Sequence, residues 1–370
     1  MCDDGLDLEQ FWRDDARAHE NNAFNDGSLV ALGIRMHHEC VFDELGIRGH
    51  PWETPDPVQM NAWARAYNDR AERIVGRRLL NENLRPREQQ FPAIRRIGEV
   101  FGSRYVWRHH TEWLERSIMS PAGLEKVLDR VETMDFREFM LPPEWEAEKT
   151  RLYEQYGLRP EPLRHVRGPV TLACSVYGAE ELIFLLCDAA ELAARFARAI
   201  THAILEMGRV MDEEAGTPAA AVRGFSFADD NCCLLNPEMY EAFGYPVLRA
   251  VFAHYSPDPG DPRYQHSDSD MGHLLPLLGR LDLTGVNFGP NVLVPEIRRY
   301  LPRARIDGCI APFAFSRNDL GELTRQTIRD CCDGLRYGGV NLSTAGSINP
   351  GSRLTSLRHI MALVQEHGRR

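Results

Sequence analysis

The chain contains 370 residues, of which 43% are hydrophobic and 26% are charged, so it can bury a large core. That length suits either one large α/β barrel or two ordinary domains, and composition does not choose between them. The formal net charge of −11 would repel a polyphosphate backbone, and no Lys/Arg run with interleaved aromatics opposes it, which excludes nucleic acid as a partner.

The amino-terminal segment gives no sign of export or membrane insertion. Residues 1–10 are acidic and lack an apolar core, and no window of the sequence approaches the roughly 20 apolar residues of a membrane span. The nine cysteines, an odd number, form neither CxxC pairs nor the dense spacing of secreted disulfide scaffolds. We therefore expect a cytoplasmic protein with reduced thiols and no membrane partner.

The first 160 residues favour helices. Pro57–Leu80 predicts a long amphipathic helix, with apolar residues loosely on one side and Arg and Asp residues elsewhere. Pro121–Val131 and Glu144–Tyr156 predict two further helices, each with proline in or near its first turn. Strand signals in this part are confined to Ser28–Ile34 and Ala93–Ile97.

After residue 163 the sequence alternates short apolar runs with helical stretches, which is the pattern of repeated βα units. The predicted strands are Val170–Ser175, Ala220–Phe227, Tyr264–Ser267, Thr284–Phe288, Ala304–Ile310 and Gly339–Leu342. The predicted helices lie near Glu191–Asp212, Pro237–His254, Asp270–Leu278, Val294–Leu301, Asp319–Leu335 and Arg353–Glu366.

Polar or glycine-rich residues follow several of these predicted strands. They include Ala228–Asn231, His266–Asp268, Asn287–Gly289 and Asp307–Cys309. In a parallel barrel such positions lie at the carboxyl ends of the strands, where active sites form. The sequence therefore predicts one domain over residues 1–370, an α/β fold built as a single (β/α)8 TIM barrel with extra amino-terminal helices. Residues 1–160 would supply the helical elaboration and the first strands, and residues 161–370 the remaining βα units.

Four motifs from residue 167 onward resemble the uroporphyrinogen decarboxylase superfamily, in the order that the family shows. They are Arg167-Gly-Pro-Val-Thr-Leu-Ala173 with Tyr177-Gly178; Asp229-Asp230 with Leu235-Asn-Pro-Glu-Met-Tyr240; His266 with Leu274-Leu275-Pro276; and Gly338-Gly339 with Ser347-Ile348-Asn349-Pro350. The resemblance implies the family's barrel. It also implies one of two activities: cofactor-free decarboxylation of tetrapyrrole acetate side chains, or zinc-dependent methyl transfer involving corrinoid proteins, thiols or folates.

The two branches of the superfamily differ in motifs that this chain departs from. The decarboxylases carry an arginine-rich RQAGR segment that grips substrate carboxylates, and here Arg35 stands alone at a comparable early position. The methyltransferases carry His-x-Cys and a second Cys as zinc ligands, whereas this chain has His266-Ser267-Asp268 and no cysteine in Ser343–Ser347. The resemblance is closer to the methyltransferase-like branch, with an altered metal site.

His266 and Asp268 lie two residues apart, so on a strand their side chains project to the same side and could hold one metal ion. One imidazole with hard oxygen ligands suits zinc or another divalent metal, and Cys309 could supply a thiolate in space. The alternatives are that Asp268 caps a helix, His266 only binds substrate and Cys309 is a packed thiol. Asp229 and Asp230 are candidate general acids or bases, and since neighbouring residues point oppositely, at most one should enter the pocket.

The remaining candidates are polar residues at predicted strand ends. His37, His38 and Glu39 follow the apolar run Val30–Ile34. They could form a proton relay or supply metal ligands, or they could lie in a surface loop. Besides His37 as a catalytic residue, the candidates for binding substrate are Arg35, His38, Tyr177, Asn287 and Asp307.

From these residues we expect a methyltransferase-like enzyme that moves a methyl or one-carbon group from a small substrate, with a corrinoid protein or related acceptor as partner. The alternative enzyme is a decarboxylase or lyase of a small carboxylic acid, with Asp229 or Asp230 as proton donor and Arg35 or Arg223 for the carboxylate. A third hypothesis is a non-catalytic barrel that acts as a binding module.

Overall fold

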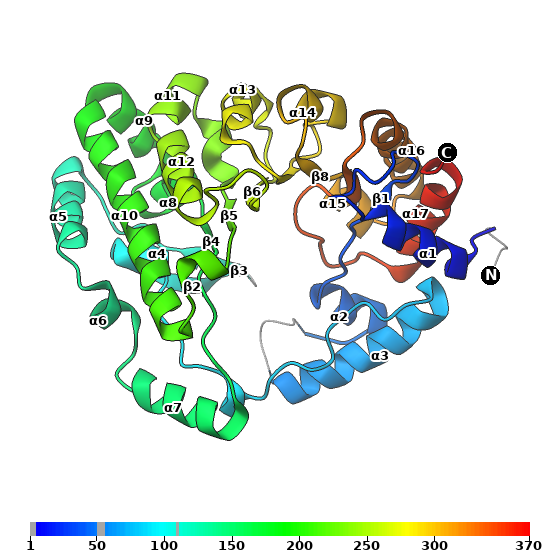
Figure 1. Ribbon diagram of the computed structural model, residues 1–370, viewed down its shortest axis with the longest axis horizontal. Coiled ribbons are helices and arrows are strands. Elements are labelled where there is room, and N and C mark those ends of the chain that lie inside the picture. The colour runs from blue at the N-terminus through cyan, green and yellow to red at the C-terminus, as the bar shows by residue number, and fades with distance from the viewer. Residues whose placement is uncertain (1–4, 50–55, 109–110) are drawn as a thin grey trace. The chain divides into compact units, whose positions relative to one another are not determined.

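The computed structural model describes residues 5–49, 56–108 and 111–370. They form two compact units, each described by itself below (Figure 1). The terminal unit comprises Met1–Pro86, Asp268–Gly272 and Gly285–Arg370, and the central unit comprises Arg87–Ser267 and His273–Thr284. Both units contain parallel strands followed by helices, so the expected α/β class is confirmed.

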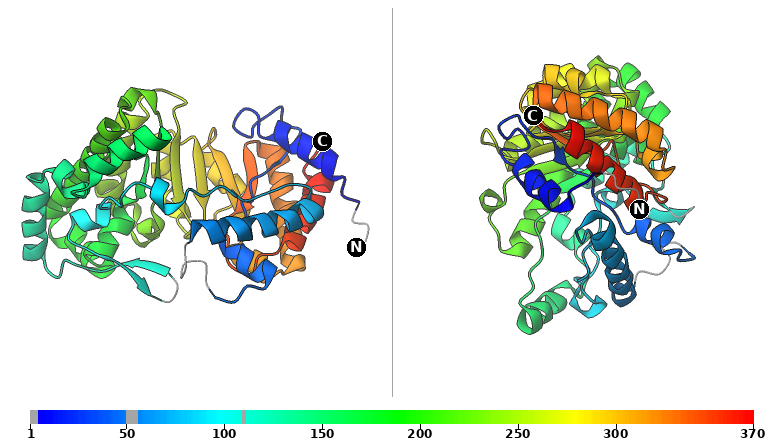
Figure 2. Two further views of the ribbon diagram at one scale, coloured as in Figure 1. Left: turned by 90° about the horizontal axis from the view of Figure 1, so that it is seen from below. Right: turned by 90° about the vertical axis from the view of Figure 1, so that its right-hand side faces the viewer.

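The terminal unit contains four parallel strands in the order β1-β9-β8-β7. These strands are β1 (Ala31–Leu32), β7 (Gly285–Phe288), β8 (Arg305–Ile310) and β9 (Val340–Thr344). The helices are α1 (Leu8–Ala18), α2 (Glu39–Leu45), α3 (Pro57–Val75), α14 (Val294–Tyr300), α15 (Pro312–Ser316), α16 (Leu320–Tyr337) and α17 (Leu354–His367). Within this unit α17 packs against both α16 and α3, as the views of Figure 2 also show.

The central unit contains three parallel strands in the order β4-β5-β6 and a separate antiparallel hairpin. The parallel strands are β4 (His165–Arg167), β5 (Phe225–Ala228) and β6 (Arg263–Ser267), and the hairpin pairs β2 (Tyr105–Arg108) with β3 (Thr111–Leu114). The helices are α4 (Ile97–Val100), α5 (Pro121–Glu132), α6 (Phe136–Met140), α7 (Trp145–Tyr156), α8 (Pro169–Val176), α9 (Ala179–Asp188), α10 (Ala190–Ala215), α11 (Pro237–Ala242), α12 (Gly244–Tyr255) and α13 (Leu275–Leu278). Short 3₁₀ helices lie at Arg87–Gln89, Ala219–Ala221, Asp230–Leu234, Gly272–Leu274 and Gly279–Leu281.

Capping residues explain where several predicted helices begin and end. The side chain of Asp56 accepts a hydrogen bond from the backbone N–H of Val58, and Pro57 occupies the first turn of α3. This helix ends five residues earlier than the predicted Leu80, because Gly76 adopts a left-handed conformation with φ of 73°. The predicted helices around α5, α7, α10, α14, α16 and α17 are confirmed to within a few residues at each end.

Some sequence predictions are wrong in detail. Val170–Ser175 was expected to be a strand, but it lies in α8, which begins with a proline and follows the real strand, β4. Ala93–Ile97 forms no strand, since Ile97 opens the short helix α4. The predicted helix Pro237–His254 is divided at Phe243 into α11 and α12.

The core of the central unit lies on one face of its parallel sheet. Val166, Phe227 and Gln265 are buried there, and the long helix α10 packs against α5, α6 and α12 (Figure 1). Alternate residues of these strands point to the opposite face, which is less buried. Within the described residues, no single helix has both the length and the apolar composition to cross a membrane; α8 and α9 meet those criteria jointly, with a bend of 107° between them.

Candidate functional site

The less buried face of the central sheet gathers polar side chains. The register pairs His165 with Ser226 and Ala228 with His266, and these residues alternate with the buried ones along each strand. Residues paired across parallel strands share a face, as do residues two positions apart. His165, Arg167, Ser226, Tyr264 and His266 therefore project from the same side of the sheet.

Asp230 and His266 form an ion-pair contact where β5 and β6 end. The carboxylate Oδ1 of Asp230 lies 3.5 Å from Nε2 of His266, and both side chains are partly exposed, at 38% and 22%. Asp268 follows His266 after one residue, and one ligand atom from each of Asp230, His266 and Asp268 lies within 4.8 Å of the others. The predicted pair His266 and Asp268 thus lies beside Asp230, which the sequence suggests as a general acid or base.

Asp229 points away from this cluster and into the core. It is completely buried, and its Oδ1 accepts a hydrogen bond of 2.7 Å from the backbone N–H of Thr171 at the start of α8. Burial raises the pKa of Asp229 to about 7, with the charge of Asp230 contributing in the same direction. The two aspartates therefore have the opposite orientations that strand alternation predicts, and Asp230 is the one that reaches the polar face.

Four polar residues on this face were not among the candidates from the sequence: His165, Arg167, Ser226 and Tyr264. Nδ1 of His165 lies 2.8 Å from the hydroxyl of Ser226, and a guanidinium nitrogen of Arg167 donates to Ser175 at 3.3 Å. Tyr264 precedes His266 by two residues and pairs in register with Ser226. The alternation His165-x-Arg167 just before the Gly-Pro motif is typical of a strand with one polar face. The sequence prediction put the strand after that motif.

Asp307, Asn287 and Cys309 belong to the terminal unit, where the structure gives them structural partners. Asp307 lies in the middle of β8 instead of at its end, and its carboxylate pairs with Arg305 at 2.8 Å and accepts from Nδ2 of Asn341 at 2.7 Å. The amide of Asn287 donates to the backbone oxygens of Asp307 and Thr344 and accepts from the N–H of Gly346. These contacts tie β7, β8 and β9 together, and substrate binding by Asp307 or Asn287 stays a prediction.

Cys309 and Tyr177 are packed residues. Cys309 is 2% exposed, its Sγ lies 3.6 Å from the carbonyl of Val292, and burial raises the pKa of its thiol. It is not a member of the group of potential metal ligands found among the described residues. Tyr177 is also 2% exposed, follows α8, and packs its ring edge-on against Phe196. The environment of Cys309 matches its structural alternative, a packed thiol, and Tyr177 lies in an aromatic part of the core.

Arg35, His37 and His38 line a cavity of about 610 Å³ in the terminal unit. They follow β1, and α2 begins immediately after His38. Burial lowers the pKa of His38, with the neighbouring His37 adding to the effect. The three residues therefore share one pocket, and their catalytic and substrate-binding roles stay predictions.

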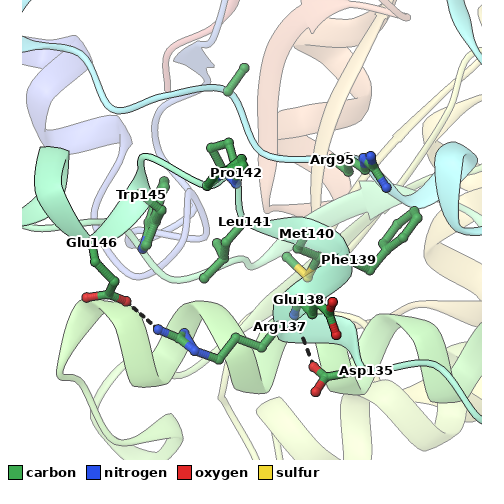
Figure 3. Close-up of a pocket in the computed structure, with 12 residues that line it drawn as sticks. Arg95, Asp135, Arg137, Glu138, Phe139, Met140, Leu141, Pro142, Trp145 and Glu146 are labelled. Atoms are coloured by element: carbon green, nitrogen blue, oxygen red, sulfur yellow. Dashed lines mark hydrogen bonds and ion pairs between the residues drawn. The ribbon is translucent and has the colours of Figure 1, made fainter.

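A second cavity, of about 630 Å³, lies in the central unit around α6 and the start of α7 (Figure 3). The guanidinium of Arg95 stacks over Phe139 at 4.8 Å, and Arg137 pairs with Glu146 and Glu214. None of the residues singled out from the sequence lines this cavity.

The donor set of the Asp230, His266 and Asp268 cluster fits a divalent metal. Two carboxylates and one imidazole are ligands that zinc, manganese and iron accept, and two of the three are partly exposed, which leaves room for a further ligand. The set does not fit the thiolate-rich zinc site of the methyltransferases that the chain resembles, because it contains no cysteine.

The sequence and the fold of the chain are both similar to those of known proteins. Residues 152–367 match the family described as "Uroporphyrinogen decarboxylase (URO-D)". No curated protein matches the sequence. A solved structure of a "methyltransferase from Methanosarcina mazei" is similar, with a TM-score of 0.60 at 15% sequence identity, over 95% of this chain and 97% of that chain. The likeness shows a shared fold and confirms the expected α/β barrel class, and since the family match spans more than half of the chain, the protein belongs to the uroporphyrinogen decarboxylase family.

Proposed function

We propose that the protein is a metal-dependent methyltransferase that removes a methyl or one-carbon group from a small substrate and passes it to a corrinoid protein or related acceptor. One observation carries the proposal: Asp230, His266 and Asp268 offer three ligand atoms within 4.8 Å of one another. Membership of the uroporphyrinogen decarboxylase family and the shared fold with a methyltransferase support it.

In such a transfer the methyl carbon leaves its heteroatom, and the heteroatom keeps the bonding electron pair. A bound divalent metal would stabilise the resulting negative charge as a Lewis acid. Asp230, His266 and Asp268 would hold that metal. Arg167, on the same face of the sheet as His266, would bind an anionic part of the substrate.

The chemistry of the cluster also indicates which heteroatom of the substrate carries the methyl group. Thiol activation by zinc in this family uses soft cysteine ligands, whereas carboxylates and imidazole favour harder oxygen or nitrogen groups. We therefore propose that the methyl group is bonded to oxygen or nitrogen in the substrate, and that the metal does not activate a thiol acceptor.

A second candidate function is decarboxylation of a small carboxylic acid, and Arg167 favours it. Its guanidinium, on the same face of the sheet as His266, could bind a substrate carboxylate. Asp230 or His266, both partly exposed, could then donate a proton to the carbanion that remains. This reaction needs no metal, so metal content separates the two candidates.

The test is the metal content of the purified protein and of His266→Ala. The methyltransferase proposal expects near-stoichiometric divalent metal in the natural protein and a large loss in the variant, because one of three protein ligands is removed. His254→Ala, which alters an exposed histidine of α12 in the same unit, is the matched control and should keep its metal.

Two outcomes would contradict metal-dependent transfer. The first is a metal-free protein that remains active. The second is a His266→Ala variant that keeps its metal but loses about 10²-fold to 10⁴-fold in turnover, since a loss of that size with metal retained indicates acid–base catalysis. Asp268→Asn refines the test, because a neutral amide is a poor replacement for a charged ligand but can keep a hydrogen bond.

A further inference from the structure

The cavity of about 610 Å³ in the terminal unit is cationic although the whole chain has a net charge of −11. Arg35, Arg77 and Arg78 line it, together with His19, His37 and His38. Asp15 is the single carboxylate among these described lining residues. Its charge is compensated within the protein, because it lies 3.5 Å from Nε2 of His19 and accepts a 2.8 Å hydrogen bond from the N–H of Leu32.

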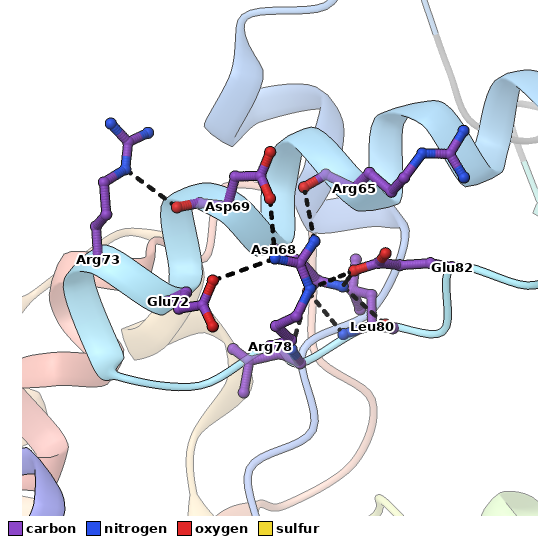
Figure 4. Close-up of polar contacts among 9 residues, drawn as sticks. Arg65, Asn68, Asp69, Glu72, Arg73, Arg78, Leu80 and Glu82 are labelled. Carbon is purple, nitrogen blue, oxygen red and sulfur yellow. Dashed lines mark hydrogen bonds and ion pairs between the residues drawn. The ribbon is translucent and has the colours of Figure 1, made fainter.

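Arg78 lines the cavity, and its charge is paired with neighbouring carboxylates. Figure 4 shows these contacts. Its guanidinium contacts Glu82 at 2.6 Å, Asp69 at 2.9 Å and Glu72 at 3.2 Å. The completely buried Asn68 accepts from the N–H groups of Leu79 and Leu80 and donates to the carbonyl of Leu80. These bonds attach Arg78, Leu79 and Leu80 to helix α3, so this part of the wall is held by contacts within the protein.

Arg77 and Arg35 differ from Arg78, because no carboxylate in the described part of the chain pairs with either of them. Arg77 lies over the indole of Trp12, 5.0 Å from the ring centroid, and Nε1 of Trp12 is itself anchored to the carbonyl of Val75 at 2.7 Å. Such stacking orients a guanidinium while its N–H donors remain available for an oxyanion. Arginine presents these donors in a planar fork that matches carboxylate and phosphate.

Asn341 adds an acceptor to the same lining. Its Nδ2 donates to Asp307, which fixes the amide orientation, and its Oδ1 is buried with no hydrogen-bond partner. The residue is 9% exposed and packs over Gly33, where a Cβ atom would lie 2.5 Å from Oδ1. An unsatisfied buried acceptor is costly, and a hydroxyl or amino donor of a ligand would relieve that cost.

We propose that this cavity is a binding site for a small oxyanion that also carries a hydroxyl or amino group, such as a hydroxy acid, an amino acid or a sugar phosphate. Arg35 and Arg77 would bind the carboxylate or phosphate, and Oδ1 of Asn341 would accept from the donor group. The cavity volume lies within the range of small-molecule sites, roughly 300–1,000 Å³. The proposal stands on contacts within the terminal unit and does not depend on the metal cluster.

Isothermal titration calorimetry of the full chain with L-malate, succinate and glycerol 3-phosphate tests the site. We expect a Kd below about 1 mM for malate or glycerol 3-phosphate, and weaker binding at higher salt. Succinate lacks the hydroxyl of malate, so it should bind several-fold more weakly if Asn341 is satisfied by the ligand. Whichever of malate and glycerol 3-phosphate binds more tightly identifies carboxylate or phosphate as the natural anion.

Variants assign the binding to the two arginines. Arg77→Gln and Arg35→Gln should each weaken binding by about tenfold to a hundredfold, which corresponds to one charge-assisted hydrogen bond. Arg73→Gln is the matched control, because Arg73 lies on the same helix as the Arg78 network, bonds to the carbonyl of Asp69 and does not line the cavity. Melting temperatures of all three variants verify that they are folded.

Three results would overturn the proposal. One is the absence of binding at about 10 mM of each probe. Another is an equal loss of affinity in Arg73→Gln and Arg77→Gln, which would indicate a diffuse charge effect. The third is equal affinity for malate and succinate, which would remove the role of Asn341 and with it the hydroxyl or amino requirement.

Discussion

Asp307 of the terminal unit and Asp229 of the central unit are both buried carboxyl groups, one within a parallel strand and one directly after a parallel strand. They differ in the neighbouring groups that offset the cost of burying them. Asp307 faces the guanidinium of Arg305 and the amide of Asn341. Asp229 receives hydrogen bonds from Thr171, and no cation is among the groups that most affect it. The first arrangement stabilises a charge inside a sheet, whereas the second leaves a carboxyl group that retains a proton up to about neutral pH.

The comparison also separates structural from functional polar residues. In the terminal unit the polar residues of the strands bond to one another and to the backbone, so they hold β7, β8 and β9 in register. In the central unit Asp230 and His266 remain partly exposed at the ends of their strands. A polar residue after an apolar run is therefore a stronger site candidate where its side chain stays partly exposed.

The largest expected effect on stability is that of Asp307→Ala. Removal of this carboxylate leaves Arg305 and Asn341 without their partner in a buried sheet, and we expect a loss of about 2–4 kcal/mol in the free energy of unfolding. The side chain of Arg305 is 33% exposed, so water should keep the loss below that of a fully buried pair.

Urea denaturation of Asp307→Ala and Asp230→Ala measures this contrast directly. Asp230 is partly exposed, so its variant should change the free energy of unfolding by roughly 0.5 kcal/mol or less. Equal losses in the two variants would mean that the Asp230 contact is as structural as the Asp307 network, and the distinction between the two units would fail.

A pH-dependent effect of intermediate size is expected for Asp229→Asn. Because the folded-state pKa is raised from 3.8 to about 7, the folded protein keeps a proton that the unfolded chain releases. The stability of the natural protein should therefore fall as pH rises from about 4 to about 7, by up to about 1.4 kcal/mol per pH unit from this group, and level off above that.

The asparagine variant cannot titrate at this position, so its stability profile should lack that slope. Urea denaturation between pH 4 and 8 with EDTA present, which keeps metal out of the neighbouring cluster, provides the measurement. Asp188→Asn, which changes an exposed carboxylate at the end of α9, is the control and should follow the natural protein. A natural protein whose stability does not decline over this window would show that Asp229 is ionised in the folded protein.

The smallest effect is expected for Thr171→Val. The threonine hydroxyl accepts a 2.9 Å hydrogen bond from the N–H of Asn231, and its hydrogen bond to Asp229 favours the ionised carboxylate. Valine has a similar volume but no hydroxyl, so we expect a loss of about 1 kcal/mol. The pH at which stability levels off should also move upward, and an unmoved profile would show that hydrogen bonding contributes little to the state of Asp229.

The sequence predicted the repeating part of the fold because its signals are local. Alternation of apolar runs with helical stretches located β6 to β9 and helices such as α10, α16 and α17. The same alternation predicted a strand at Val170–Ser175, where the structure has a helix. Five apolar or small residues in this segment suit a buried helix as well as a strand. Pro169, directly before them, lies in the first turn of α8. Three-residue strands such as β4 leave too short a pattern to detect.

The candidate site was predictable only where chain neighbours define it. His266 and Asp268 could be paired because they are two residues apart, and the opposite orientations of Asp229 and Asp230 followed from strand alternation. The contact between Asp230 and His266 depends on the register between β5 and β6, which no local pattern encodes. For the same reason the sequence could not show that Asn341 and Asn287 would engage the neighbouring strands of the sheet.

The terminal unit joins segments from both ends of the chain, and this affects how the protein is synthesised. Ala31 of β1 pairs with Asn341 of β9, and Val30 donates to the carbonyl of Gly368. At roughly 5–20 residues per second, a ribosome that has completed β1 needs roughly 15–60 s more to produce β9. Over that interval the central unit emerges in full while β1 has no parallel partner, so the terminal unit can complete its sheet only after the central unit has been synthesised.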